Sequence, residues 1–332
     1  MLVWIQFLIC TVVIVYAGSH LSHYGDVIAE KTGMGRTWIG VVLMASATSL
    51  PELFTGISSV AIFNSPNIAA GDVLGACMLN LLILAILDVG LKAAPISTLA
   101  HQGQILTAAF GVLLLGLTTI NLLANESIPA LGWIGLLSLI IPLVYLAGMR
   151  LIFNYEKRRI AEFLTEVKEE ARYDHVSKSA AYWRFAFYAV IIVAAATYLP
   201  YVADEIATIT GLGQTFVGSI LVALSTTLPE TVVSKAALRI GAVDLAVGNV
   251  LGSNLFNLLI LAIDDAFFLK GPLLSFVSPM HAVTACAAMT MTAITMIALV
   301  YRSKKRILFF SWESIGVYLV YAVTVLLLFL KR

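Results

Sequence analysis

Two glutamates lie inside long apolar segments of this chain, each directly after a proline. Glu52 ends the stretch TSLPE at 48–52, and Glu230 ends the stretch TTLPE at 226–230. A carboxylate in an apolar segment has to be compensated, because removing a charge from water is costly. The proline disrupts the helical hydrogen bond to the carbonyl four residues earlier, so backbone oxygens are freed nearby. Carboxylate, hydroxyl and carbonyl oxygens are ligands for hard cations such as Ca²⁺, with Na⁺ as a competitor.

Two sets of neighbouring oxygens accompany the glutamates. Hydroxyls lie within about one helical turn, and the freed carbonyls are those around Ala45 and Ala47 and around Ala223 and Ser225. The hydroxyls are those of Thr48, Ser49, Thr226 and Thr227. One such glutamate is explained equally well as a protonated packing residue, but two matched copies favour a cation site.

The composition places these motifs in a membrane. The chain has 332 residues, of which 60% are hydrophobic and 12% charged, and its mean hydropathy is +0.97. Ten apolar segments are long enough to cross a hydrocarbon core. They are residues 2–24, 36–63, 68–91, 102–123, 131–153, 183–203, 213–239, 243–264, 279–301 and 308–330. An all-α integral membrane protein with ten transmembrane helices is therefore predicted, and its three cysteines suggest neither a disulfide framework nor a zinc site.

Positive charge predicts the orientation. With ten spans, 17 of the 20 Lys and Arg residues fall on the side of the central polar stretch, and only Lys270, Lys331 and Arg332 fall on the other. Cytoplasmic loops retain positive charge. We expect a multi-pass protein of the cell membrane with a cytoplasmic central loop and both termini on the outside.

The chain contains an internal repeat. TGMGRTWIG at 32–40 aligns with TGLGQTFVG at 210–218, and the same offset of 178 superposes the two Leu-Pro-Glu triplets. GDVLGACMLNLLILAI at 71–86 matches 248–263 at an offset of 177 with 11 of 16 positions identical, which is too many for chance. Each unit holds five spans, so the second copy enters the membrane from the opposite side. Inverted repeats are typical of secondary transporters, whose sites lie near the midplane at the repeat interface.

The repeat sets the domain organisation. Residues 1–153 form the first five-helix repeat and 183–332 the second, each with a Pro-broken helix at the midplane. The polar stretch 154–182 joins them and has Ile160, Phe163, Leu164 and Val167 at helical spacing. We expect this linker to contain an amphipathic helix at the cytoplasmic interface.

The third and eighth spans carry a companion pattern. Gly75 and Gly252 permit close helix packing, and Asn80 and Asn257 place amides about one turn further along. Close packing explains the glycines, but it does not explain paired amides in apolar helices.

At these residues the chain resembles the cation/calcium antiporter superfamily, the sodium/calcium exchangers and their relatives. The resemblance rests on TSLPE, TTLPE and GSNLFN at 252–257, and the overall plan covers the whole chain. It implies an antiporter that exports Ca²⁺ against inward Na⁺, with four cation sites between spans two, three, seven and eight. The long first and sixth spans would slide across the remainder to alternate access.

The resemblance also implies roles for individual residues. Glu52 and Glu230 would be the central ligands shared by Ca²⁺ and Na⁺. The remaining ligands would be the oxygens of Thr48, Ser49, Thr226 and Thr227, the carbonyls of Ala45 and Ala223, the hydroxyl of Ser253, and the amides of Asn80 and Asn257.

Four positions depart from the family pattern. The first repeat has Ala76 and Cys77 where Ser and Asn are common, and Asn257 stands where some exchangers have Asp. Asp72 replaces an expected Asn and would add an acid close to the outer mouth. Two glutamates neutralise one Ca²⁺, and two protons or two or more Na⁺ with some positive excess can also neutralise them. The coupling ion therefore stays open between Na⁺ and H⁺, and the alternative function is antiport of Ca²⁺ or another divalent cation against H⁺.

Other functional classes lack support in the sequence. It has no His-Glu-x-x-His, no Gly-x-Ser-x-Gly and no matched protease aspartates, so an enzyme such as an intramembrane protease is not expected. Nothing indicates the ring of identical pore loops of a channel. The expected partners are Ca²⁺, Na⁺ and the lipid bilayer, with no nucleic acid and no covalent cofactor, and a monomer is expected.

Overall fold

The computed structural model describes residues 1–32, 46–91, 94–124, 127–163 and 177–331. The first half contains α1 (Leu2–Thr32), α3 (Leu50–Ala61), α4 (Pro66–Val89), α5 (Ile96–Leu99), α6 (Gln104–Ala124), β1 (Ala130–Leu131), β2 (Ile134–Gly135) and α7 (Leu136–Phe163). The second contains α8 (Lys178–Thr210), α9 (Gly213–Phe216), η3 (Val217–Val222), α10 (Ala223–Arg239), α11 (Val243–Phe267), η4 (Leu273–Ser275), α12 (Met280–Tyr301), β3 (Arg306–Ile307), β4 (Phe310–Ser311) and α13 (Trp312–Leu330).

The helices follow the predicted spans closely. Within the described ranges nine helices are long and apolar enough to cross a membrane, counting the continuous run from α9 to α10 as one. The predicted second span, 36–63, lies partly outside the described residues, and its described part contains α3. A mostly helical membrane protein is confirmed, and the count of ten stays a prediction.

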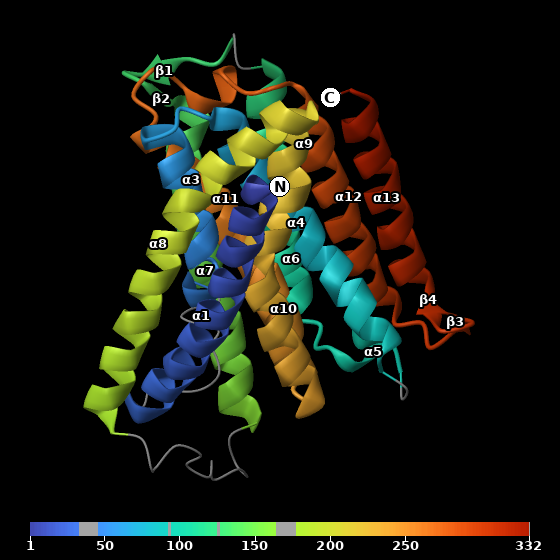
Figure 1. Ribbon diagram of the computed structural model, residues 1–332. Helices are drawn as coiled ribbons and strands as arrows, with labels where there is room; N and C mark the ends of the chain where they lie inside the picture. The colour runs from blue at the N-terminus through green and yellow to red at the C-terminus, as the bar shows by residue number, and fades with distance from the viewer. Residues whose placement is uncertain (33–45, 92–93, 125–126, 164–176, 332) are drawn as a thin grey trace.

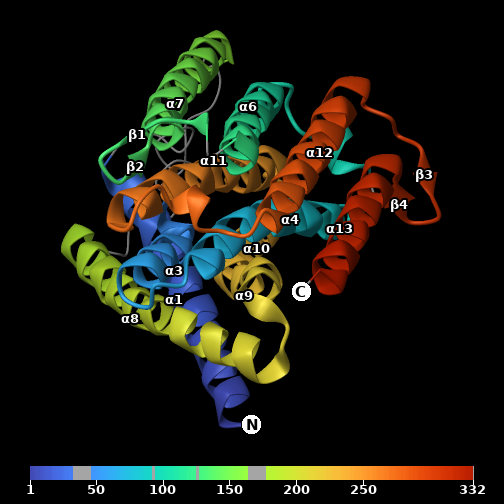
Figure 2. The same ribbon diagram turned by 90° about the horizontal axis from the view of Figure 1, so that it is seen from above.

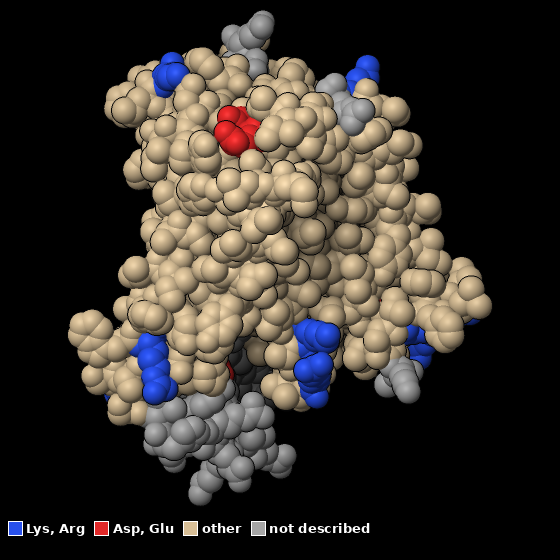
Figure 3. All heavy atoms as spheres, viewed as in Figure 1, with Lys and Arg blue, Asp and Glu red and all other residues tan. Residues whose placement is uncertain are grey.

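Both termini lie at one end of the bundle, and the ends of α7 and α8 that flank the 164–176 segment lie at the other (Figure 1). We call these the terminal end and the linker end. Figure 3 shows Lys and Arg near both ends of one face and a broad belt without them between. Such a belt fits the hydrocarbon layer.

Two short hairpins show the inverted symmetry. The β1–β2 pairs are Ala130↔Gly135 and Leu131↔Ile134, and the β3–β4 pairs at an offset of 176 are Arg306↔Ser311 and Ile307↔Phe310. Each hairpin leads into the last helix of its half, yet the two lie at opposite ends of the bundle (Figure 1). The halves therefore have the same topology and opposite direction.

The helices α4 and α11 form the centre of the molecule (Figure 2). In their most apolar segments, 83% of the residues of α4 and 78% of those of α11 are buried. The corresponding shares are only 22% for α1 and 28% for α8, which face outward. The long helices α1 and α8 pack together on one side, with the Tyr188 ring stacked on Tyr24 and on His20. Gln6 also donates to the Tyr198 hydroxyl at 3.2 Å. The two helices thus form a pair at the edge of a buried core.

Each of these outer helices contacts the Pro-Glu helix of the other half. Gly18 of α1 lies against Pro229 of α10, where a Cβ on the glycine would be 2.7 Å from the proline ring. Thr55 of α3 donates to the Ala196 carbonyl of α8 at 3.3 Å. The two halves therefore interlock around the Leu-Pro-Glu segments.

The two prolines have different local effects. In the first copy a turn at Ser49 precedes Pro51, and α3 begins at Leu50. In the second copy the helix continues through Pro229, and the irregularity is the π-helical segment η3 just before α10. A π segment widens the helix and changes the direction of the groups that follow it.

The ends of the predicted linker are helical, because α7 continues to Phe163 and α8 begins at Lys178. The predicted interfacial helix lies largely outside the described residues, so it stays a prediction.

Candidate functional site

Glu52 and Glu230 are both fully buried in the middle of the bundle. They come from opposite halves, and the negative charge of Glu230 acts on Glu52. Both oxygens of Glu52 and Oε2 of Glu230 lack a hydrogen-bond partner within the described ranges. A pair of buried carboxylates with free oxygens is electrostatically unfavourable unless a cation or protons compensate it.

The hydroxyls of each Leu-Pro-Glu motif face the carboxylate of the other half. Ser49 donates to Glu230 Oε1 at 3.2 Å, and the Thr48 hydroxyl also interacts with Glu230. Thr226 in turn lies beside Glu52. Thr227 Oγ1 is buried without a partner among the described residues. All four predicted hydroxyls therefore lie in one buried region.

Asp72 belongs to the same region, and the expectation that it lies close to the outer mouth stays a prediction. Its side chain is fully buried, and its Oδ1 accepts from Thr226 Oγ1 at 2.8 Å. Its charge acts on Glu52. Asp72 lies in the second turn of α4, where α4 packs closely against η3.

Glycines on α4 permit that close packing. A Cβ at Gly75 would be 2.2 Å from the Ser219 carbonyl oxygen, and one at Gly71 would be 2.8 Å from the Ser219 nitrogen. The backbones of α4 and η3 therefore touch directly. Ser219 Oγ, fully buried and without a partner among the described residues, is a polar group that the sequence did not single out.

Amides line the crossing of α4 and α11. Asn80 Nδ2 donates to Asn254 Oδ1 at 2.9 Å, and Asn254 Nδ2 donates to the Cys77 carbonyl at 3.1 Å. Both polar atoms of Asn257 lack a partner in the described part of the chain, as does Asn80 Oδ1. The Ser253 hydroxyl lies near Glu230. Asn254, whose counterpart in the first half is Cys77, joins the two helices here.

The predicted carbonyl ligands are less clear. Ala45 lies outside the described residues. The Ala223 carbonyl is buried and accepts from Thr226 Oγ1 at 3.2 Å. Within the described ranges, no three His, Cys, Asp or Glu side chains converge closely enough to hold a metal ion. A hard cation at this site would need the hydroxyl, amide and backbone oxygens in addition to the carboxylates, as the 6–8 oxygen ligands typical of Ca²⁺ require.

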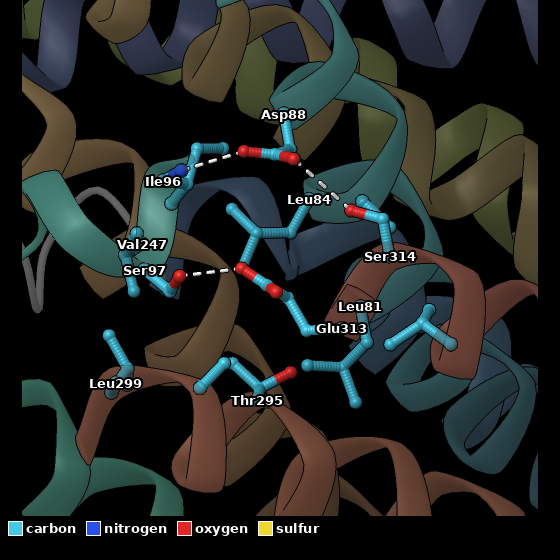
Figure 4. A pocket seen from close by; sticks show the side chains of 13 residues that line it. Leu81, Leu84, Asp88, Ile96, Ser97, Val247, Thr295, Leu299, Glu313 and Ser314 are labelled. Atoms are coloured by element: carbon cyan, nitrogen blue, oxygen red, sulfur yellow. Dashed lines mark hydrogen bonds between the residues drawn. The ribbon is translucent and has the colours of Figure 1, made fainter. Parts of the chain in front are cut away.

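A separate cavity of about 30 Å³ lies at the linker end, lined by residues of α4, α5, α11, α12 and α13 (Figure 4). Each of its acids has at least one partner: Asp88 accepts from the Ile96 nitrogen at 2.6 Å, and Ser97 donates to Glu313 Oε1 at 2.5 Å. Glu313 Oε2 has no hydrogen-bond partner within the described ranges. Arg306 lies 3.5 Å from Asp88. Most of the lining is aliphatic, so the polar groups here fasten the helix ends together.

Comparisons with known proteins find a matching family model, similar sequences and similar folds. The family model described as sodium/calcium exchanger protein matches residues 2–151 and 180–330. The inner membrane protein YrbG of Escherichia coli is 26% identical over 250 residues, 74% of each chain. The structure of the sodium-calcium exchanger NCX_Mj superposes with a TM-score of 0.63 and 19% identity, covering 98% of both chains. The H⁺/Ca²⁺ exchanger CAX superposes with a TM-score of 0.71 and 13% identity over 99% of this chain and 86% of CAX.

Proposed function

The chain belongs to the sodium/calcium exchanger family, and we propose that it is an antiporter that exports Ca²⁺ in exchange for Na⁺ by alternating access. The observation that carries the proposal is the pair of buried glutamates from opposite halves, each beside hydroxyls of the other half. Such a site binds cargo without converting it chemically, so we propose a transporter rather than an enzyme.

The charge of the site fits a divalent cargo. Glu52 and Glu230 together neutralise one Ca²⁺, and their free oxygens are hard ligands. After Ca²⁺ leaves, the same carboxylates remain buried and must be compensated by another cation. Na⁺ bound by the carboxylates and hydroxyls fills that role, and this requirement couples the two ion movements.

The interlocked outer helices support the alternating-access part of the proposal. Helices α1 and α8 are joined by stacked rings, and Gly18 of α1 presents a flat surface to Pro229. Movement of this pair across α3 and α10 would open the glutamate region first to one end and then to the other. Each chain holds a complete pair of glutamates, so we propose that a monomer suffices for transport.

The orientation is part of the proposal. Positively charged helix ends such as Lys178, Arg239 and Arg302 lie at the linker end. By the positive-inside rule we place the linker end in the cytoplasm and both termini outside the cell membrane.

The alternative coupling ion is H⁺, because protons compensate the same carboxylates and CAX, a structural neighbour, is an H⁺/Ca²⁺ exchanger. Purified protein in liposomes loaded with Na⁺ is expected to take up ⁴⁵Ca²⁺ when Na⁺ is diluted outside at equal pH. Uptake driven only by a pH gradient would refute the sodium assignment. Uptake under neither gradient would refute Ca²⁺ antiport itself.

A further inference from the structure

Asp264 of α11 is a fully buried acid that the site described above does not use. Both of its oxygens lack a hydrogen-bond partner within the described ranges. The adjacent Asp265 is also buried, but its oxygens accept from the Gly135 nitrogen at 2.9 Å and the Leu273 nitrogen at 2.5 Å. Only the first of these two neighbouring aspartates is therefore left uncompensated.

The repeat shows that the fold does not require Asp264. At the offset of 177, Asp265 corresponds to Asp88 and Asp264 to Leu87. Asp88 and Asp265 have the same structural role, since each accepts from the backbone nitrogen eight residues later, Ile96 and Leu273. In the first half a leucine precedes that aspartate. The second half thus has a buried acid, Asp264, at a position where the first half has the apolar side chain of Leu87.

A glycine on α3 makes room for this acid. A Cβ at Gly56 would lie 2.3 Å from Asp264 Oδ2 and 2.5 Å from Oδ1. The residue matching Gly56 in the second half is Ser234. Gly56 follows Glu52 by four residues, which is one helical turn or about 6 Å along α3. Asp264 therefore lies about one turn from Glu52, toward the terminal end.

The surroundings contain negative charge and no described basic side chain that reaches the acid. The charges of Asp72 on α4 and Asp265 on α11 act on Asp264. On α3 the nearest titratable group is Glu52; the described parts of α6, β2 and η4 contribute none. Four acids, Glu52, Asp72, Glu230 and Asp264, are fully buried in this part of the bundle. One Ca²⁺ balances two of them.

We propose that Asp264 is an additional cation station, which holds one monovalent cation, Na⁺ or a proton, one turn from Glu52 on the side of the terminal end. This inference rests on the proposed antiport and extends it. The ion at Asp264 is transported in each exchange cycle. The protein therefore exchanges one more monovalent cation per Ca²⁺ than it would without Asp264.

The test measures the coupling stoichiometry, the number of monovalent cations exchanged per Ca²⁺, in proteoliposomes. A fixed Ca²⁺ gradient is set, and the monovalent cation gradient at which net Ca²⁺ flux stops gives this number. One arm uses a Na⁺ gradient at equal pH, and the other a pH gradient without Na⁺. Asp264→Asn and Asp264→Leu, the latter being the residue of the other half, are expected to exchange Ca²⁺ with one fewer monovalent cation. The arm in which the number changes identifies the ion. Asp244→Asn, which removes an exposed acid at the linker end, is the control and keeps the wild-type number.

Gly56→Ala provides a second variant, because its methyl group displaces the Asp264 carboxylate while the acid itself remains. This variant is also expected to exchange one fewer monovalent cation per Ca²⁺. An unchanged number in both Asp264 variants would overturn the proposal. Complete loss of exchange in folded Asp264→Leu would also overturn it, because Asp264 would then belong to the Ca²⁺ site itself. Failure of wild-type protein to exchange Ca²⁺ would instead refute the proposed function.

Discussion

Gly75→Ala tests whether direct backbone contact between α4 and η3 builds the site. The added Cβ would lie 2.2 Å from the Ser219 carbonyl oxygen and 2.7 Å from Ser219 Cα, whereas ordinary contact begins at 3.4 Å. The helices must therefore separate by about 1.2 Å, the difference between these two oxygen distances. A separation of this size along the 2.8 Å hydrogen bond from Thr226 Oγ1 to Asp72 Oδ1 would place these two oxygens about 4 Å apart, which is beyond hydrogen-bond range.

The expected cost combines two effects. Overpacking a close-packed contact costs about 1–3 kcal/mol, and loss of a hydrogen bond to a charged group costs about 1.5–3 kcal/mol. We expect Gly75→Ala to lower the free energy of unfolding by about 2.5–6 kcal/mol and to weaken Ca²⁺ binding as well. Thermal unfolding in detergent, with and without Ca²⁺, measures both effects.

Gly116→Ala is the matched control, because its Cβ would meet only Met289 Sδ at 4.0 Å. It lies on the spanning helix α6 and is expected to change stability by less than about 0.5 kcal/mol. Equal unfolding temperatures for the two variants would refute the inferred close approach. A destabilised Gly75→Ala with wild-type Ca²⁺ affinity would show that the contact supports the fold but not the site.

Three further substitutions test individual side chains. Glu230→Gln keeps the shape but removes a buried charge, so it should abolish ⁴⁵Ca²⁺ exchange and the Ca²⁺-induced stabilisation, which is about 2.7 kcal/mol for wild type at 100 times Kd; a preserved thermal shift would contradict the assignment. Ser49→Ala removes the 3.2 Å bond to Glu230 and should weaken Ca²⁺ binding about tenfold, whereas Ser58→Ala, whose hydroxyl bonds its own helix, should bind normally. Asp265→Asn can accept with only one oxygen, so it should cost about 1.5–3 kcal/mol of stability; an unfolding temperature equal to wild type would show that neither loop bond matters.

The sequence predicted the central pair because repetition supplies three-dimensional information. Two identical triplets in inverted halves have to meet near the symmetry axis, so Glu52 and Glu230 could be paired without coordinates. Asp72 could not be placed in the same way. Its position depends on how closely α4 approaches η3, and that distance is fixed by Gly71 and Gly75 together with a π segment that has no sequence signature here. From the spans alone, Asp72 could be expected only to lie close to the outer mouth.

Asp264 escaped notice for a related reason. It stands beside an aspartate with an ordinary structural role, near a helix end where acids are common in sequence. Only the filled space at Gly56 and the absence of partners for its oxygens among the described residues distinguish it. Burial and hydrogen-bond satisfaction are properties of the packed chain, and hydropathy periodicity does not report them.

The deviations from repeat symmetry have a common direction along the bundle. Asp72 and Asp264 both lie toward the terminal end, and their counterparts toward the linker end are the uncharged Asn249 and Leu87. Asn249 Nδ2 donates to Ser234 Oγ at 3.1 Å, so the second half has a hydrogen bond between neutral groups where the first half has Asp72. In the proposed transport cycle, a cation that leaves toward the terminal end would pass Asp72 and Asp264, two further buried acids. One that leaves toward the linker end would pass the uncharged Asn249 and Leu87 instead. Although the scaffold is nearly symmetric, we expect the two open states of the proposed cycle to hold cations with unequal affinity, because the negative charge is concentrated on one side of the glutamate pair.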